Sequence, residues 1–238
     1  MHRFFAERLS EDAAVLPPEE ENHALRVLRL QAGDDCQALM DGCVYTAVIR
    51  ETSPRVVLTI QEALPSPEPS VSVTLYQGIP KGEKMDYIVQ KCTEAGVCRV
   101  VPVAFSRCVA RWEGKDAAKK QARYQRIAAE AAKQSGRAVT PDITLPLSFA
   151  EMRGEIGAHR LILVPWEEEH GNGIRANWQG EQDVAIIIGP EGGISSEEID
   201  QLKAAGAKPV TLGPRIFRTE TAGLAALISL LTLSGDME

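Results

Sequence analysis

The chain has 238 residues, of which 44% are hydrophobic and 25% charged, a composition typical of a folded protein with one large domain or a large and a small one. No apolar run approaches the roughly eighteen residues of a membrane-spanning helix, and residues 1–8 contain no apolar signal core, so we expect a cytoplasmic protein without a membrane partner. Five cysteines without CxxC spacing argue against a disulfide framework or a zinc ribbon, and no metal site is expected.

The net charge of −7 conceals an uneven distribution along the chain. Residues 81–137 carry 13 basic and 6 acidic side chains, whereas residues 1–69 carry a net −6 and residues 138–238 a net −8. A locally basic stretch can bind phosphates, or it can simply be a solvated helix face. Charge alone leaves both interpretations open.

Residues 1–64 have the pattern of a small β-rich module that ends at a proline-rich boundary, residues 65–70. The elements expected in it are a helix at 20–30 and strands at 35–40, 44–50 and 55–61. Asp41-Gly42 predicts a hairpin turn between the first two strands. Such a barrel-like module binds RNA in some proteins and only packs in others.

After the boundary, strands and helices alternate, which predicts an α/β fold with a parallel sheet. The expected strands are 71–77, 97–104, 161–165, 184–188 and 210–212, and the expected helices are 82–95, 115–135 and 219–234. In the second helix we expect Ala117, Ala118, Ala128, Ala131 and Ala132 to pack inward and Lys119, Lys120, Arg123 and Arg126 to face outward. In the last helix, the expected apolar stripe is Leu224, Leu227, Ile228 and Leu231.

Two glycine-proline loops follow the last two of these strands, at 188–193 and 212–220. Glycines let the backbone approach a ligand closely, and prolines stiffen the turns. Because ligands bind at the carboxyl ends of parallel strands, both loops are expected to border one binding site. Ser195 and Glu198 predict a capping box for the helix after the first loop, and Thr219 is expected to cap the last helix through its hydroxyl.

Charged residues in and near these loops suggest further roles. Arg215 and Arg218 beside a helix start favour a ligand-facing position for at least one of them, the alternative being a brace with Glu220. Glu191 is expected to fix its own loop through backbone hydrogen bonds. One carboxylate of Glu167 to Glu169 could face a cationic cofactor, and these residues could equally form a solvated loop. His159 and His170 are expected in surface loops.

Marks of several enzyme classes are missing: there is no GxxxxGK[ST], GxSxG or HExxH motif, and no GxGxxG follows the first strand of the α/β region. Instead, GPEGGIS at 189–195 and LGPRIFRTETA at 212–222 resemble the SPOUT superfamily, and within it the ribosomal RNA small subunit methyltransferase E family, which methylates N3 of a uridine in 16S rRNA. Further matching segments are Arg3-Phe4-Phe5, Val27-Leu28-Arg29, residues 81–85, residues 90–97 and residues 134–137.

This resemblance implies a SPOUT-type methyltransferase domain with a trefoil knot at 70–238 and a PUA-like RNA-binding β-barrel domain at 1–69. It also implies a homodimer, S-adenosylmethionine as the cofactor, and ribosomal RNA or an assembled small subunit as the partner. The sequence departs from the family pattern at Phe217, where an aliphatic residue is usual, and at Asn22, where a histidine is common.

The chemistry of uridine methylation suggests roles for the charged residues of the second loop. We hypothesise that Arg215 or Arg218 stabilises charge on the uracil carbonyls or anchors the phosphate, and that Glu220 orients that arginine. The implied cofactor-binding residues are Leu163, Pro165, Ile188, Gly189, Pro190, Glu191, Gly192, Gly193, Leu212, Gly213, Ile216, Arg218 and Thr219. The implied RNA contacts are Arg3, His23, Arg26, Arg29, Lys81, Lys84, Arg107 and Arg137.

Two other functions fit the same motifs: ribose 2′-O-methylation by the same fold, and a non-catalytic RNA-binding or ribosome assembly protein with a degenerate cofactor pocket. The intact glycine loop at 189–193 weighs against the second.

Overall fold

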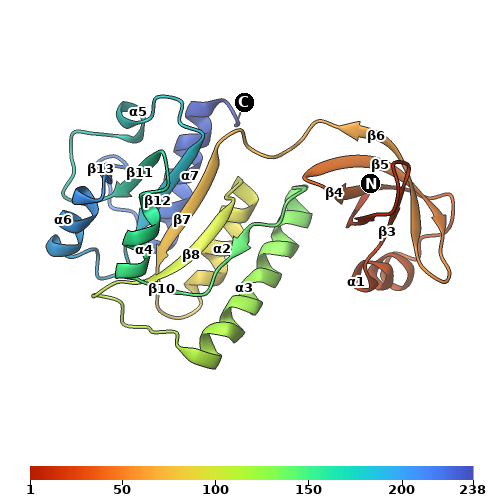
Figure 1. Cartoon of the computed structure of the whole chain (residues 1–238), viewed down its shortest axis with the longest axis horizontal. Helices are drawn as coiled ribbons and strands as arrows, with labels where there is room; N and C mark the ends of the chain where they lie inside the picture. Colours follow the sequence, from red (N-terminus) through yellow and green to blue (C-terminus); the bar gives the residue numbers. More distant parts are fainter. Residues whose placement is uncertain (238) are drawn as a thin grey trace. The chain divides into compact units, whose positions relative to one another are not determined.

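The computed structural model describes residues 1–237, which form two compact units (Figure 1). Unit 1 comprises Met1–Glu68 together with Ala132–Thr140, and unit 2 comprises Pro69–Ala131 and the chain from Pro141 onward. The expected domain ranges were 1–69 and 70–238. The segment at 132–140 differs from this division, because it packs with the first unit.

Unit 1 contains a six-stranded mixed sheet in the order β1-β4-β5-β6-β3-β2. Its strands are β1 (His2–Phe5), β2 (Glu7–Arg8), β3 (Ala13–Val15), β4 (Asp35–Met40), β5 (Cys43–Glu51) and β6 (Val57–Leu64). The strands β1 and β2 lie at opposite edges, although only Ala6 separates them in the chain, so the sheet must curl until its edges meet. The hairpin turn is confirmed: Asp41 and Gly42 both have positive φ, at 55° and 72°.

The helical segment of unit 1 differs from the expected helix at 20–30. It begins earlier, as α1 (Pro18–Asn22), because Pro18 suits the first turn of a helix. It then widens into the π-helix η1 (His23–Val27), in which the Leu28 N–H donates to the carbonyl oxygen of His23 over 3.0 Å.

Unit 2 is built on a seven-stranded sheet whose pairings are all parallel, with β10-β8-β7-β12-β11-β13 in order and β9 beside β8. The strands are β7 (Ser72–Gly78), β8 (Arg99–Ala104), β9 (Asp142–Ile143), β10 (Leu147–Ser148), β11 (Leu161–Pro165), β12 (Asp183–Ile188) and β13 (Lys208–Val210). The helices are α2 (Lys84–Ala95), α3 (Gly114–Ser135), α4 (Phe149–Ile156), α5 (Ile174–Asn177), α6 (Ser196–Ala204) and α7 (Thr219–Ser234). The last turn of α3, from Ala132 onward, belongs to unit 1. The expected parallel sheet is therefore confirmed.

Two short strands and two helices of unit 2 had not been expected. The helix α4 could have been predicted from the sequence, because Ser148 and Glu151 form a full capping box at its start. The expected capping box of Ser195 and Glu198 is confirmed at α6.

The buried faces of the long helices differ from expectation at three positions. In α3, Ala118 is exposed, while the other four alanines are buried. In α7, Ile228 is 37% exposed and Leu224 only partly buried, whereas small residues such as Ala226 lie in the core. A helix that packs closely on a sheet buries small residues. The prediction of the buried face was therefore wrong where it rested only on large apolar side chains.

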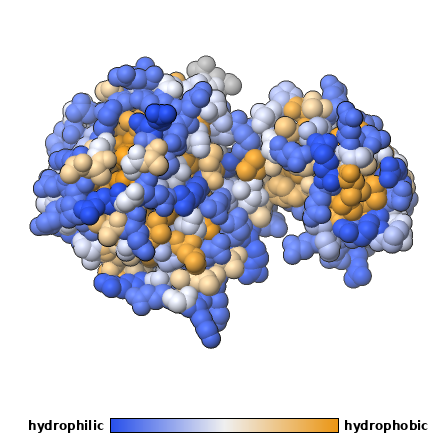
Figure 2. All heavy atoms as spheres, in the orientation of Figure 1, coloured by the Kyte–Doolittle hydropathy of each residue, from blue (hydrophilic) through white to orange (hydrophobic). Residues whose placement is uncertain are grey.

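Polar and charged residues cover most of the face seen in Figure 2. Within residues 1–237, no helix has the length and apolarity needed to cross a membrane.

Arg137, an expected RNA contact, instead lies buried inside unit 1. Its side chain is 4% exposed, and its Nε and Nη2 atoms donate to Glu68 Oε2 over 3.0 and 2.6 Å. The other oxygen of Glu68 accepts the N–H groups of Ala138 and Val139. Glu68 therefore fastens residues 137–139 to the rest of the unit, and Arg137 is not placed to meet RNA.

We expect Glu68→Ala to destabilise unit 1 by about 3 kcal/mol, because it removes two hydrogen bonds to a buried guanidinium and the acceptor of two backbone N–H groups. The shift of the urea unfolding midpoint, followed by circular dichroism, measures the effect. Glu62→Ala, an exposed carboxylate on β6, is the control and should change the midpoint little. Equal shifts for the two variants would contradict the bracing role.

Candidate functional site

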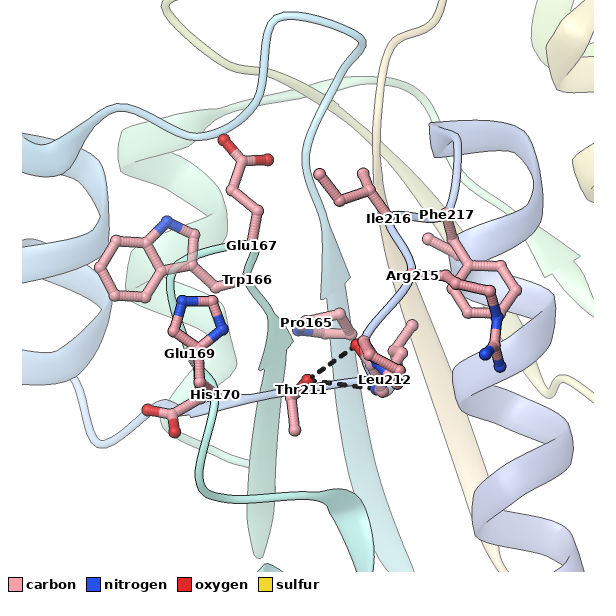
Figure 3. A pocket seen from close by; sticks show the side chains of 13 residues that line it. Pro165, Trp166, Glu167, Glu169, His170, Thr211, Leu212, Arg215, Ile216 and Phe217 are labelled. Atoms are coloured by element: carbon pink, nitrogen blue, oxygen red, sulfur yellow. Dashed lines mark hydrogen bonds between the residues drawn. The ribbon is translucent and has the colours of Figure 1, made fainter.

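A cavity of about 250 Å³ opens where β11 and β13 end (Figure 3). These strands pair in parallel, with Pro165 opposite Val210, so the segments that leave them start side by side. The cavity is lined by Pro165, Trp166, Glu167, Glu169, His170, Thr211, Leu212, Gly213, Pro214, Arg215, Ile216, Phe217 and Ala222. This is the edge of a parallel sheet at which ligands bind.

The loop after β13 forms one wall of the cavity. Gly213 adopts a φ of 102°, which favours glycine, and its N–H donates to Thr211 Oγ1 over 3.1 Å. The turn then contributes Arg215, Ile216 and Phe217 to the cavity lining, and in Figure 3 Ile216 lies on the side opposite Glu167. Ile216 is 83% exposed, so the loop offers an apolar surface without a protein partner.

The segment after β11 forms the opposite, acidic wall. Glu169 Oε1 accepts hydrogen bonds from the N–H groups of Gly171 and Asn172 over 2.8 and 3.0 Å, and these bonds lower the pKa of Glu169. Glu167 also lines the cavity. Whether one of these carboxylates faces a cationic cofactor stays a prediction, because Glu167 is exposed and Glu169 also holds its own loop.

Both histidines lie in loops, as expected; His170 is exposed, whereas the His159 side chain is largely buried. His170 lines the cavity, and its place just after a strand end was the signal that could have identified it. His159 lies in a polar network, in which its Nδ1 is 2.8 Å from Asp183 Oδ1 and its Nε2 is 3.1 Å from the Tyr76 hydroxyl. The His159 side chain is 12% exposed, so it braces the sheet.

The first glycine loop, residues 189–193, is not part of the cavity lining, although it lies next to it. A Cβ on Gly193 would stand 3.4 Å from Glu167 Oε1, and Arg107 Nη1 donates to the carbonyl oxygen of Gly192 over 3.1 Å. Of the two glycine-proline loops expected to border one site, the second lines the cavity and the first lies beside it.

One lysine joins this first loop to the start of α7. Lys84 Nζ is 3.0 Å from Glu191 Oε1 and 3.1 Å from Glu220 Oε2. The backbone N–H of Lys81 also donates to Glu191 Oε1, so Glu191 fixes its loop as expected. Glu220 pairs with Lys84, which differs from the expected role of orienting an arginine, and the ammonium group of Lys84 is engaged in this cluster.

The start of α7 also differs from expectation. Arg218, not Thr219, is the N-cap residue, and no side chain caps the helix there. The Thr219 hydroxyl instead donates to the carbonyl oxygen of Gly189 over 2.7 Å and accepts from Gln77 Nε2 over 2.9 Å. Thr219 is 7% exposed, so its hydroxyl is used inside the protein.

The other expected site residues divide by exposure. Leu163, Ile188 and Pro190 are buried at or beside strand ends, and Arg218 is exposed. Among the expected RNA contacts, four are exposed and three, including Lys84, are partly buried. The exposed ones are Arg26, Arg29, Lys81 and Arg107, and the other two that are partly buried are Arg3 and His23.

The Lys84 cluster predicts a pH dependence of stability. Burial opposes ionisation of Glu191 and Glu220, but hydrogen bonds and the Lys84 ammonium outweigh it and hold the pKa of both carboxyl groups below the ordinary 4.5. Pairing with Glu191, and then with Glu220, raises the pKa of Lys84 above 10.5. The cluster therefore stabilises the fold above about pH 4.5 and below about pH 10.5, and loses this effect as the carboxylates are protonated in acid.

We expect Lys84→Met to lower the melting temperature near neutral pH and to have a smaller effect as the pH falls through about 4. Melting curves of the variant and the parent protein over this range measure the difference. Lys81→Met is the matched control, because only the backbone of Lys81 contacts Glu191. A difference of the same size at about pH 7 and about pH 3 would argue against the ion pairs.

Comparison with known proteins shows the family of the chain. A family model described as an RNA methyltransferase domain matches residues 66–231. Ribosomal RNA small subunit methyltransferase E of Bacillus subtilis is 31% identical over 97% of this chain and 96% of its own length, and that of Aquifex aeolicus is 31% identical over 97% and 99%. The crystal structure of ribosomal RNA small subunit methyltransferase E from Neisseria gonorrhoeae, bound to S-adenosyl methionine, has 32% identity and a TM-score of 0.84 over 98% of both chains. The chain therefore belongs to the RNA methyltransferase family, among the ribosomal RNA small subunit methyltransferase E proteins.

Proposed function

We propose that this protein transfers a methyl group from S-adenosylmethionine to N3 of a uridine in 16S ribosomal RNA. The observation that carries the proposal is the cavity between the β11 and β13 loops, which has carboxylates on one wall and Arg215 with exposed apolar side chains on the other. Its relatives add support, since they are named as ribosomal RNA methyltransferases and one of them is bound to S-adenosyl methionine.

The residues of the cavity fit such a cofactor. An adenosyl sulfonium has an aromatic purine ring with flat faces and polar edges, ribose hydroxyl groups and a positive charge. The exposed Ile216 and the backbone of residues 212–216 suit the ring, and the ionised Glu169 and the nearby Glu167 suit the charge. When bound, the cofactor supplies an electrophilic methyl group.

The residues around the cavity would then position the substrate. Methyl transfer requires an in-line approach of the nucleophile, so correct orientation supplies much of the rate. Uridine N3 carries a weakly acidic proton, and charge that develops on the uracil carbonyl oxygens needs donors. Arg215 on the cavity wall and the exposed Arg218 at the start of α7 can provide them. Glu220 acts through Lys84, which fixes the helix start that carries Arg218.

The proposal also includes the fold details, the RNA-binding role of unit 1 and the homodimer that the resemblance implies. Unit 2 is assigned a trefoil knot. Unit 1 is assigned a PUA-like fold that binds RNA through exposed residues such as Arg26, in η1, and Arg29, just after it. The working form is a cytoplasmic homodimer acting on rRNA or on the small subunit. The target base must leave its stack to reach the cavity, which looped RNA permits at least cost.

Replacing Arg218 by alanine should lower the turnover rate by on the order of 100-fold, because a donor that stabilises developing charge is lost. Single-turnover transfer of labelled methyl groups at saturating RNA measures this rate. Arg160→Ala removes the same charge from an exposed residue just before β11, at the opposite end of the strand, and should leave the rate nearly unchanged. Full activity of Arg218→Ala would rule out the charge-stabilising role.

The chemistry itself is tested by the product. We expect nuclease digests of methylated RNA, analysed by mass spectrometry, to contain 3-methyluridine and no ribose-methylated nucleoside. Assays with naked 16S rRNA and with small subunits from an enzyme-deficient strain identify the substrate form. A ribose methyl would establish the 2′-O activity instead, and absence of any transfer, with no binding of S-adenosylmethionine by calorimetry, would favour a non-catalytic RNA-binding protein.

A further inference from the structure

Gln77 is fully buried at the end of β7 and is not among the residues expected at the site. Its Nε2 donates to Thr219 Oγ1 over 2.9 Å and to the carbonyl oxygen of Gly78 over 3.1 Å. The Thr219 hydroxyl in turn donates a hydrogen bond to the carbonyl oxygen of Gly189 over 2.7 Å. We call this chain of hydrogen bonds, from Gln77 through Thr219 to Gly189, the β7–α7 relay.

The relay joins three segments that are distant in sequence and meet closely in space. A Cβ on Gly78 would stand 2.5 Å from Pro190 N, so the end of β7 touches the first glycine loop backbone to backbone. A Cβ on Gly223 would stand 3.2 Å from the Leu75 side chain and 3.5 Å from Gln77 Oε1, so α7 also presses directly on β7. The relay lies where strand, loop and helix converge.

Stability alone does not explain an amide at this position. Gln77 Oε1 is buried and has no hydrogen-bond donor among residues 1–237. A buried acceptor left unpaired costs free energy that an apolar side chain of similar size would avoid. The amide nitrogen of Gln77, which is hydrogen-bonded, is the atom that contacts Thr219. We infer that the residue serves to orient this hydroxyl.

The relay affects the site because Thr219 lies next to charged residues of the site in the sequence. Arg218 immediately precedes it and Glu220 follows it, while Gly189 is two residues before Glu191. Holding Thr219 against Gly189 therefore fixes Arg218, at the start of α7, relative to the first glycine loop. The Lys84 cluster connects the same two segments on the solvent side, between Glu191 and Glu220.

We propose that Gln77 is a positioning residue for methyl transfer: through the Thr219 hydroxyl it locks the start of α7 to the first glycine loop, so that both hold one geometry around the cavity. Its effect on rate rests on the proposed methyltransferase function, whereas the mechanical coupling of the two loops does not.

Hydrogen exchange of the full-length protein, followed by mass spectrometry, tests the coupling without cofactor. Gln77→Leu and Thr219→Val should each accelerate exchange about 10-fold in peptides covering both 189–195 and 212–220, because either change opens the relay. Thr219→Ser keeps the hydroxyl and should restore slow exchange. Thr221→Val removes a hydroxyl from the same helical turn, and Thr74→Val alters the same strand, so these two are the matched controls and should leave the 189–195 peptides unchanged.

Methylation assays then test the consequence. We expect Gln77→Leu and Thr219→Val each to lower kcat about 10-fold with little change in the KM for RNA, and the double variant to lose no more than either single one, because both break one relay. Unchanged exchange at 189–195 in both single variants would refute the coupling. Faster exchange with normal kcat would refute the positioning role. A parent protein that transfers no methyl group refutes the proposed function instead, and the exchange data still decide the coupling.

Discussion

The parallel pairing of β11 with both β12 and β13 is the constraint on which the site depends. It brings the carboxyl ends of strands that are far apart in sequence to one edge of the sheet, where the segments after Pro165 and Val210 enclose the cavity. The loop after β12 starts at the same edge and supports the cavity from the side. A ligand held there meets peptide groups and loop side chains that no single segment could supply.

Two sets of contacts keep these loops in place. On the solvent side, Lys84 pairs with Glu191 and Glu220, and inside the protein, the Thr219 hydroxyl joins Gln77 to the carbonyl oxygen of Gly189. Both sets connect the first glycine loop to the start of α7. Polar residues in these positions make the arrangement specific, because each bond requires one register between helix and loop.

The basic stretch at 81–137 shows why charge counts along a sequence are ambiguous. Several of its cations are matched by carboxylates outside the stretch, as Arg99 is by Glu155 and Lys133 is by Glu20. Others, such as Lys119 and Arg126, remain exposed on α3. Part of the local excess therefore supports the fold, and only the remainder is available to phosphates.

The sequence by itself determined the parallel sheet, the Asp41-Gly42 turn, the Ser195 cap and the two glycine-proline loops, because these follow from periodicity and from local backbone preferences. Only the tertiary structure decided that Arg137 is buried against Glu68, that Glu220 pairs with Lys84, that Thr219 bonds to Gly189 and that His170 lines the cavity. Those contacts join residues that are distant in sequence. The partner of such a side chain depends on which distant segments the fold brings next to it, and the local sequence pattern does not contain this information.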